Sequence, residues 1–245
     1  MNGAPIRGGG ILAAGAGLRL RRAGWTMPKP LVPVAGTPLI EHVIRNCQAA
    51  GVSSLTIIVN EQARECGRWV RSRFPDLRPQ IIVKTTASSL ESFQEVAGRV
   101  GPGRALISTV DAWCPREAFR AFVGAARRFP PEATVLAVTP LVDDERPLWV
   151  TWDPSGRVTG LGGESGDGVT AGMYVVPERV RRLSPPPGLA SLREFLAWLL
   201  QRGEPLYGVV LPAVVDVDRA EDVARAEALA RREDQPREHE AGGAG

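Results

Sequence analysis

The first thirty residues hold an apolar run that passes directly into a glycine-rich turn. Ile11–Ala14 predicts a short buried strand, and Gly15-Ala16-Gly17 follows it. Small residues let the backbone approach a ligand, and successive N–H groups in such a turn form a concave site for anions. Arg19, directly beyond the turn, carries the paired donors that grip phosphate oxygens. The stretch therefore predicts a site for a di- or triphosphate.

Lysine is rare in this chain, whose 30 basic residues include two lysines, Lys29 and Lys84. Lys29 lies between Pro28 and Pro30, which restrict the backbone on either side of it. Where arginine is the usual cation, a lysine fixed in this way indicates a site that needs a compact point charge. The alternative is that Lys29 is an ordinary surface lysine in a turn. We rank this interpretation second because the glycine turn precedes Lys29 in the chain.

Together these two motifs resemble the sugar-phosphate nucleotidyltransferases, also called NDP-sugar pyrophosphorylases. That family has a strand, then Leu-Ala-Ala-Gly-x-Gly-Thr-Arg, a loop and Pro-Lys-Pro. The matching residues are Leu12, Ala13, Ala14, Gly15, Gly17, Arg19, Pro28, Lys29 and Pro30. Leu18 stands where the family has a hydroxyl residue, which removes a side-chain contact to phosphate and leaves the backbone N–H. The resemblance implies catalytic roles for Arg19 and Lys29, and nucleotide binding by Leu12, Ala13, Ala14, Gly15, Ala16, Gly17 and Leu18.

Bulk composition argues against several other classes of protein. The 245 residues, 44% of them apolar, predict one catalytic domain over 1–232, and the charged, glycine-rich 233–245 predicts a disordered tail. Net charge is only +3 and no nucleic-acid or zinc motif is present, so we expect no nucleic-acid partner. Cys47, Cys66 and Cys114 have no metal-type spacing and are typical of reduced thiols. With no signal-type or membrane-spanning apolar run, we expect a cytoplasmic protein and no membrane partner.

Strand and helix signals alternate through the first 140 residues. The expected strands are 11–14, 55–59, 80–84, 104–110 and 133–139, and the expected helices are 37–51, 61–74, 88–101 and 115–129. This alternation predicts an α/β protein with a Rossmann-like, doubly wound, mostly parallel sheet. Residues 18–30 are expected to form a long loop, and Thr37-Pro38 to begin a helix as N-cap and first residue.

The second half of the chain shows a different pattern. Expected strands at 148–152, 157–161 and 169–176 are separated by short turns, which indicates a small antiparallel insertion on the acceptor side. A proline-rich linker at 184–188 follows. The remaining expected elements are a helix over 191–202, strands at 206–211 and 214–216, and a helix over 219–232.

Two carboxylates are candidates for holding Mg²⁺, the usual counterion of a nucleoside triphosphate. Asp111 follows a buried strand, and ligands of an open parallel sheet bind beyond the carboxyl ends of its strands. The resemblance also places Asp111 at the family's metal aspartate, and it places Asp216, within Val214–Asp222, at the second metal position. A helix cap is the alternative for Asp111, and Asp218 is expected to cap the last helix.

The segment expected to bind the nucleobase matches the family less well. Around Thr85–Ser89 the family's glutamine and its Gly-Thr-Ala run are both missing. Ser88 begins a capping box with Glu91 and is needed at the helix start. Ser89 is therefore the side chain expected to contact the nucleotide.

On the acceptor side, Val169–Tyr174 resembles the family's sugar-binding strand. The resemblance implies acceptor binding by Thr170 and Gly172, with Glu164 as a partner for a hydroxyl group. A solvated loop glutamate is an equally good interpretation of Glu164. His42 has no acidic neighbour that suggests a catalytic triad, and we expect it to be structural.

The resemblance implies transfer of a nucleoside monophosphate from a triphosphate to a sugar 1-phosphate, with Mg²⁺, and release of pyrophosphate. The partners are then a nucleoside triphosphate and a phosphorylated small-molecule acceptor; a monomer and a homo-oligomer both remain open. Two alternatives also remain: cytidylyl or guanylyl transfer to a non-sugar phosphate of the phosphocholine or molybdopterin type, and a nucleotide-binding module without turnover. A dinucleotide-dependent oxidoreductase is disfavoured because the third glycine and the acidic ribose ligand are missing.

Overall fold

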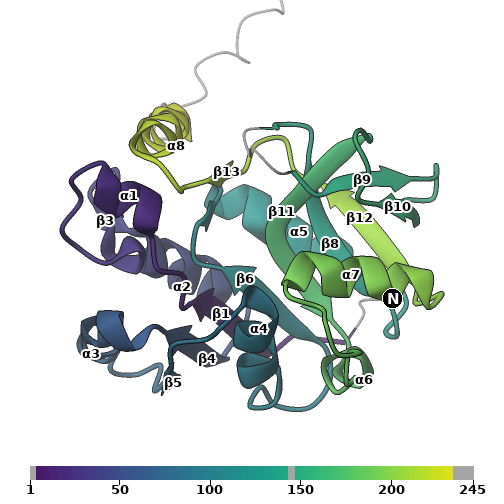
Figure 1. Ribbon diagram of the computed structural model, residues 1–245, viewed down its shortest axis with the longest axis horizontal. Helices are drawn as coiled ribbons and strands as arrows, with labels where there is room; N and C mark the ends of the chain where they lie inside the picture. The colour runs from purple at the N-terminus through teal and green to yellow at the C-terminus, as the bar shows by residue number, and fades with distance from the viewer. Residues whose placement is uncertain (1–3, 143–146, 234–245) are drawn as a thin grey trace, which may run out of the picture.

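The computed structural model describes residues 4–142 and 147–233. Within these residues a nine-stranded sheet forms the centre of the molecule, with helices on both faces (Figure 1). Its strands are β1 (Gly8–Ala13), β4 (Ser54–Val59), β5 (Gln80–Val83), β6 (Ala105–Thr109), β8 (Thr134–Thr139), β9 (Trp149–Trp152), β10 (Val158–Leu161), β11 (Gly168–Val176) and β12 (Leu206–Val210).

Most of the sheet is parallel. Strands β5, β4, β1 and β6 lie side by side and run in one direction. β11 lies antiparallel between β6 and β8, so β8 runs in the direction of β6, and β12 pairs parallel with β8. The predicted doubly wound, mostly parallel α/β architecture is confirmed. The expected antiparallel insertion is only partly separate from it, because β9 and β10 form a hairpin while β11 is a central strand of the main sheet.

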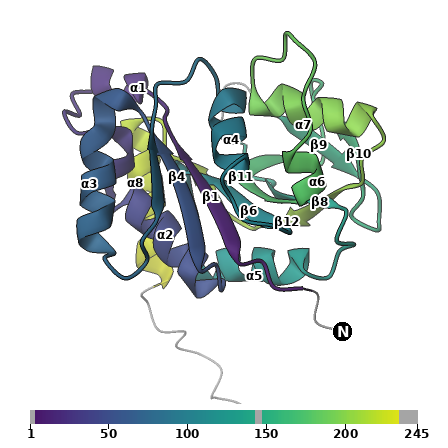
Figure 2. The same ribbon diagram turned by 90° about the horizontal axis from the view of Figure 1, so that it is seen from below.

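Helices cover the two faces of this sheet, with α4 and α7 above the strands in Figure 2 and α2 and α5 below them. The helices are α1 (Leu18–Arg22), α2 (Leu39–Ala49), α3 (Arg64–Arg73), α4 (Ser89–Ala97), α5 (Arg116–Ala126), α6 (Glu178–Arg181), α7 (Leu192–Gln201) and α8 (Ala220–Glu233), with 3₁₀ turns η1 (Lys29–Leu31) and η2 (Glu61–Ala63).

The alternation of side chains along β1 explains why both faces are covered. Ile11 and Ala13 belong to the core beneath α2 and α5, whereas Leu12 and Ala14 belong to the core beneath α4 and α7. Successive side chains of a strand point to opposite faces, so a strand that is apolar at every position needs a cover on each side.

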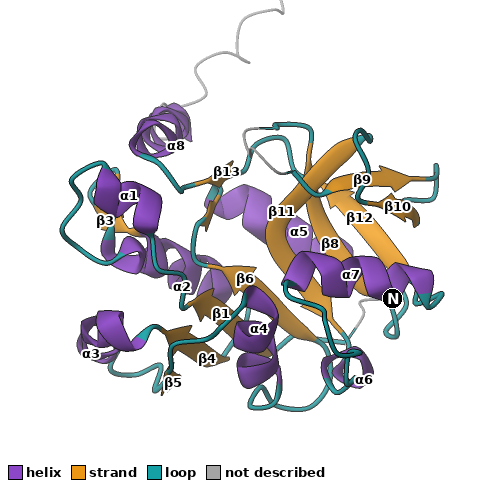
Figure 3. Ribbon diagram, in the orientation of Figure 1, coloured by secondary structure: helices purple, strands orange, loops and turns teal. Residues whose placement is uncertain are grey.

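Two short ladders lie outside the main sheet (Figure 3). One joins β2 (Pro33–Val34) to β3 (Thr37–Pro38), and the other joins β7 (Ala112–Trp113) to β13 (Val215–Asp216). The second ladder connects segments about one hundred residues apart along the chain.

The expected helix start, with Thr37 as N-cap and Pro38 as first residue, is wrong by one residue, because Pro38 is the N-cap and Leu39 the first helical residue. Thr37 instead pairs with Val34 across a tight turn in which Ala35 and Gly36 both have positive φ, 48° and 75°. Two successive residues with positive φ form a hairpin turn whose twist matches that of the flanking strands. The backbone therefore stays extended through Pro38. α2 begins at Leu39 without a side-chain cap.

The expected long loop over 18–30 is also incorrect, because it contains α1 and η1. Leu20 is fully buried in α1 and holds this short helix against the core. The predicted N-cap at Ser88 is confirmed, since its hydroxyl accepts a hydrogen bond from the N–H of Glu91 at 3.1 Å. The Glu91 carboxylate, however, accepts from the N–H of Ala87, so the capping box is not closed there.

A buried arginine fixes the far end of α4. Arg181, in α6, is 6% exposed and donates to the backbone carbonyls of Ala97, Val100, Gly101 and Gly103. These carbonyls belong to the helix end and the loop after it, where partners within the helix are missing.

The predicted disordered tail at 233–245 lies outside the described residues, apart from Glu233 at the end of α8. The described cysteines Cys47, Cys66 and Cys114 are buried and form no disulfide. None of the described helices combines the length and apolar character that a bilayer crossing requires.

Candidate active site

The parallel pairing of β1 with β6 determines where the site lies. Leu12 of β1 stands opposite Thr109 of β6, so both strands end at the same edge of the sheet. The glycine turn follows the first strand, and Asp111 follows the second. This is the edge at which open parallel sheets bind ligands.

Gly17 lets the chain pass closely beneath Lys29. It has φ 59° and is the N-cap of α1, and a Cβ at this position would lie 2.8 Å from the Cβ of Lys29. Asn60, at the end of β4, holds the start of the turn by donating from Nδ2 to the carbonyl of Ala14 at 3.2 Å.

Among the predicted nucleotide-binding residues, Leu12, Ala13 and Ala14 are buried with side chains in the two cores, which leaves their backbone for a ligand. Gly15, Ala16 and Leu18 are exposed, and Gly17 is half-buried.

Lys29 is buried in the middle of the site, with 7% of its surface exposed. Its ammonium donates to Asp111 Oδ2 at 2.6 Å and to Asp218 Oδ1. Burial by itself would lower the pKa of Lys29, but the charges of Asp111, Asp218 and Asp216 outweigh it and raise this pKa above its usual value. The side chain is therefore a permanent cation and cannot serve as a general base near neutral pH.

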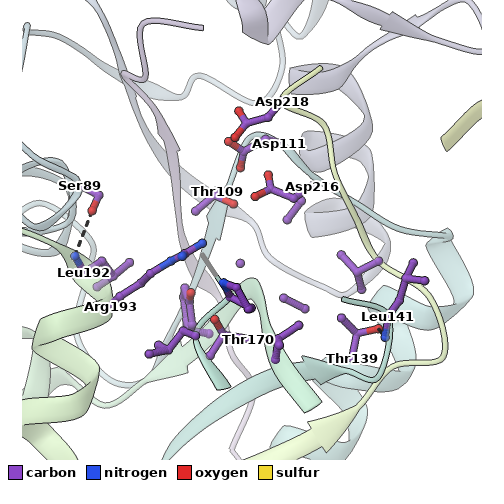
Figure 4. Close-up of a pocket in the computed structure, with 18 residues that line it drawn as sticks. Ser89, Thr109, Asp111, Thr139, Leu141, Thr170, Leu192, Arg193, Asp216 and Asp218 are labelled. Carbon is purple, nitrogen blue, oxygen red and sulfur yellow. Dashed lines mark hydrogen bonds between the residues drawn. The ribbon is translucent and has the colours of Figure 1, made fainter. Parts of the chain in front are cut away.

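The β7–β13 ladder brings Asp216 to Asp111. Asp216 pairs with Ala112, the residue after Asp111, and the N–H of Val217 donates to the carbonyl of Asp111 at 3.0 Å. Carboxylate oxygens of Asp111, Asp216 and Asp218 lie within 4.8 Å of one another, and all three side chains gather at one wall of a pocket (Figure 4). Three clustered carboxylates supply the oxygen ligands that Mg²⁺ prefers, so the residues fit this ion.

The expectation that Asp218 caps the last helix is wrong. Its carboxylate accepts from Lys29 and from Arg19 Nη1, the latter at 2.9 Å. The capping role belongs to Asp222, whose Oδ2 accepts from the N–H groups of Asp218 and Arg219 at 3.0 and 2.7 Å. With Asp222 reaching back to the helix start, Asp218 is directed into the site.

The carboxylate partners of Lys29 line one hollow, and Lys29 itself lines a second. The first has a volume of about 270 Å³, and Figure 4 shows the side chains around it. Its lining residues are Ser89, Thr109, Asp111, Ala112, Thr139, Leu141, Pro147, Leu148, Val169, Thr170, Ala171, Gly172, Tyr174, Leu192, Arg193, Val214, Asp216 and Asp218. The second, of about 160 Å³, is lined by Gly15, Ala16, Arg21, Thr26, Met27, Pro28, Lys29, Pro30, Asn60, Gln62, Ala63 and Glu65.

The predicted acceptor residues have different positions. Thr170 and Gly172 line the larger hollow, where β11 bulges between Thr170 and Tyr174. Gly172 has φ 69°, and a Cβ there would lie 2.5 Å from Thr109 Oγ1, so the bulge needs glycine. Glu164 is exposed between β10 and β11 and is not among the lining residues.

Ser89 lines the larger hollow rather than the one beside the glycine turn, and its hydroxyl accepts from the N–H of Leu192 at 3.0 Å. This bond joins the start of α4 to the start of α7. The next residue, Arg193, extends its side chain into the pocket (Figure 4). Neither Arg193 nor Asn60 follows from a local pattern, because each reaches the site from an element whose position depends on the assembled sheet.

His42 lies outside both hollows. Its Nε2 is 3.1 Å from the carbonyl of Val34, and its ring meets Trp113 edge-on at 5.9 Å between centroids. Burial lowers the pKa of this imidazole. These contacts are structural.

Comparisons with known proteins agree with this geometry. A 2-aminoethylphosphonate cytidylyltransferase from Lancefieldella rimae is 40% identical over 65 residues, which is 26% of each chain. A probable mannose-1-phosphate guanylyltransferase 2 from Arabidopsis thaliana is 27% identical over 220 residues, covering 82% of this chain and 58% of the relative. The chain thus spans less than two thirds of either curated relative.

The fold itself also has solved counterparts. The inositol-1-phosphate CTP transferase from T. maritima superimposes with a TM-score of 0.81 over 94% of this chain and 98% of its own, at 19% identity. Residues 9–168 match the MobA-like NTP transferase domain, a region that contains the glycine turn, Lys29 and Asp111. This chain belongs to the family of MobA-like NTP transferase domains.

Proposed function

We propose that this chain transfers a nucleoside monophosphate from a nucleoside triphosphate to a sugar 1-phosphate and releases pyrophosphate, with Mg²⁺ as cofactor. One observation carries the proposal: a buried ammonium, Lys29, lines one hollow and is paired with two of the three clustered carboxylates that line the other. The hollow beside the glycine turn suits the triphosphate, and the hollow beneath the aspartates suits the acceptor.

In the proposed reaction an oxygen of the acceptor phosphate forms a bond to the α-phosphorus, and the bond from that phosphorus to the bridging α–β oxygen breaks. The attacking phosphate is already an anion, so no general base is required. Catalysis then consists of positioning and charge neutralisation. A lysine that stays protonated in a buried site meets this requirement.

Each residue has a part in this mechanism. Lys29 neutralises the α-phosphate and the attacking group, and it stays protonated because of its carboxylate partners. Arg19, at the start of α1, and the backbone of Gly15–Gly17 hold the departing pyrophosphate. Asp111, Asp216 and Asp218 would hold the cation. When bound, Mg²⁺ would neutralise part of the negative charge on the donor and acceptor phosphates.

A non-sugar acceptor is the second candidate, and the similarity to a 2-aminoethylphosphonate cytidylyltransferase supports it. Both candidates use the same triphosphate site, and they differ in what fills the larger hollow.

Pyrophosphate release tests the proposal directly. The full chain is assayed with ATP, CTP, GTP, UTP and dTTP against glucose 1-phosphate, mannose 1-phosphate and inositol 1-phosphate, with and without Mg²⁺. We expect Mg²⁺-dependent release that requires an acceptor and falls at least about 100-fold in Asp216→Asn. Triphosphate binding without turnover on any acceptor, phosphonates and phosphocholine included, would instead identify a nucleotide-binding module.

A further inference from the structure

Asn60 is a buried amide beside the glycine turn. It follows β4, is 8% exposed, and lines the smaller hollow together with Gly15 and Lys29. The hydrogen bonds of its side chain reach three segments: the glycine turn, the 3₁₀ turn η2, and the segment expected to bind the nucleobase. A buried amide is costly to leave without partners, so these bonds give it one orientation.

The partners of Asn60 determine which way its amide points. Oδ1 accepts from the backbone N–H of Gln62 at 2.9 Å and from the hydroxyl of Thr85 at 3.3 Å. A backbone N–H can only donate, so the amide oxygen must face Gln62. The amide nitrogen then faces the glycine turn, where Nδ2 donates to the carbonyl of Ala14 at 3.2 Å. A flipped amide would set two donors against each other at Gln62 and two acceptors at Ala14.

The bond from Asn60 fixes the peptide group that begins the glycine turn. The carbonyl of Ala14 and the N–H of Gly15 belong to one planar trans peptide, so they point in opposite directions. Strands β4 and β6 flank β1 on its two sides. Because the carbonyl faces Asn60 at the end of β4, the N–H of Gly15 faces the side of β6, the strand that precedes Asp111. Gly15 is exposed, and a Cβ added there would meet nothing within 4 Å, so the backbone is open to a ligand.

We infer that Asn60 is a positioning residue for the triphosphate: by holding the carbonyl of Ala14, it directs the N–H of Gly15 at a phosphate oxygen between the glycine turn and Asp111. A peptide held in this direction donates to an anion without first having to rotate, which is the advantage of a preorganised donor. The inference rests on the proposed function for the identity of the ligand. A role limited to capping η2 would account for the bond to Gln62 and leave the bond to Ala14 without a purpose.

Two substitutions separate positioning from capping. Asn60→Ser keeps an oxygen that can cap η2, but its side chain is too short to place a donor at the carbonyl of Ala14. Asn60→Asp keeps the shape of the side chain and the bond to Gln62, and it replaces the donor by an acceptor. Arg181→Met is the matched control, because it also removes a buried donor from backbone carbonyls, in the loop before β6 and at the opposite end of that strand from Asp111.

Affinity is measured by calorimetry for inorganic pyrophosphate and for ATP, CTP, GTP, UTP and dTTP, each with Mg²⁺. We expect both Asn60 variants to bind pyrophosphate and the preferred triphosphate at least about tenfold more weakly than wild type, the effect of one hydrogen bond to a charged group. Where turnover occurs, KM for the triphosphate should rise, and KM for the acceptor should stay within about twofold. Arg181→Met should lower the Tm and keep both affinities. Equal weakening of donor and acceptor would reduce Asn60 to a structural role and overturn the inference.

A measurement on the wild-type chain does not depend on how well the variants fold. In a ¹H–¹⁵N NMR spectrum the Gly15 amide is assigned by its absence from the spectrum of Gly15→Ala. Titration with pyrophosphate and Mg²⁺ should shift the Gly15 amide proton downfield, because its N–H then donates to an anion. The shift should be smaller in Asn60→Ser.

The outcomes separate this inference from the proposed function. If triphosphates bind without turnover and the Asn60 variants weaken that binding, the inference holds and the enzymatic proposal fails. If the chain turns over but Asn60→Ser keeps the wild-type affinities, or the Gly15 amide does not shift, the inference is overturned and the enzymatic proposal stands. A wild-type chain that binds neither pyrophosphate nor any triphosphate would overturn both.

Discussion

Replacing Lys29 by methionine removes the ammonium at the centre of the site while keeping most of the volume of the side chain. In the wild-type chain this group is 7% exposed and lies 2.6 Å from Asp111 Oδ2, with Asp218 as its second partner. The variant leaves the carboxylates of Asp111, Asp216 and Asp218 facing one another without that cation.

The expected loss of stability depends on how much solvent screens the carboxylates that remain. Removing one partner of a buried ion pair costs about 3–5 kcal/mol. The side chains of Asp111 and Asp218 are 25% and 36% exposed, so solvent screens part of the penalty, and we expect about 3 kcal/mol. For a domain of this size that is a fall in Tm of about 6–12 °C. Loss of one preorganised electrostatic contact should lower kcat by about 10²–10³-fold.

Thermal unfolding with and without Mg²⁺, together with pyrophosphate release, measures both effects. Mg²⁺ should raise the Tm of Lys29→Met more than that of wild type, because the ion no longer competes with the ammonium for carboxylate oxygens. Lys84→Met is the matched control: Lys84 pairs with Glu91 and Glu95 at the surface, where solvent screens the charges, so its loss should leave the Tm nearly unchanged. If Lys29→Met keeps the wild-type Tm and kcat, both the burial argument and the catalytic assignment are refuted.

Four further outcomes are expected. Gly17→Ala should lower stability by about 1–2 kcal/mol and raise KM for the triphosphate, because φ 59° and the 2.8 Å approach to the Cβ of Lys29 exclude a Cβ. Gly15→Ala is the control, since a Cβ there meets open space and should not lower stability; equal melting curves for the two variants would contradict the prediction. Asp218→Asn should raise the Mg²⁺ concentration for half-maximal turnover at least about tenfold, whereas a role limited to helix capping predicts no change. Arg181→Met should lower the free energy of unfolding in urea by about 3 kcal/mol and leave kcat unchanged, because four backbone carbonyls lose a buried donor. A variant that keeps its stability but loses turnover would contradict this purely structural role. Burial raises the pKa of the Glu41 carboxyl, but Arg45 and Arg73 outweigh it and hold this pKa below its usual value of 4.5, so the stabilisation that the carboxylate provides should be present above pH 4.5 and lost as the pH falls through the pKa of the folded state. Glu41→Gln should therefore flatten the acid side of the pH–stability curve, and identical curves for the variant and wild type would refute this role.

Local chemistry allowed much of the fold to be predicted. The run Ile11–Ala14 is apolar at every position because both faces of the sheet are covered there, and this shows directly in the sequence. Thr37-Pro38 shows where such patterns fail: the same two residues suit a helix start and the second strand of a hairpin. The positive φ of Ala35 and Gly36 decided between the two.

Part of the candidate site was also predictable from residues that are adjacent in the sequence. The glycine turn, Lys29 between its prolines and Asp111 after its strand are each placed by the residues beside them, so each was recognisable in the linear sequence. Their meeting at one edge follows from a parallel sheet, which the alternation of strands and helices already implied.

The rest depended on contacts between distant segments. Asp216 reaches Asp111 only through the register of β13 against β7, and Asp218 enters the site only because Asp222 takes over the cap of α8. Arg193 reaches the pocket from a helix start that Ser89 holds from another helix. A one-residue change in the register of β13 would turn Asp216 to the opposite face, and no local pattern records which register the assembled sheet selects.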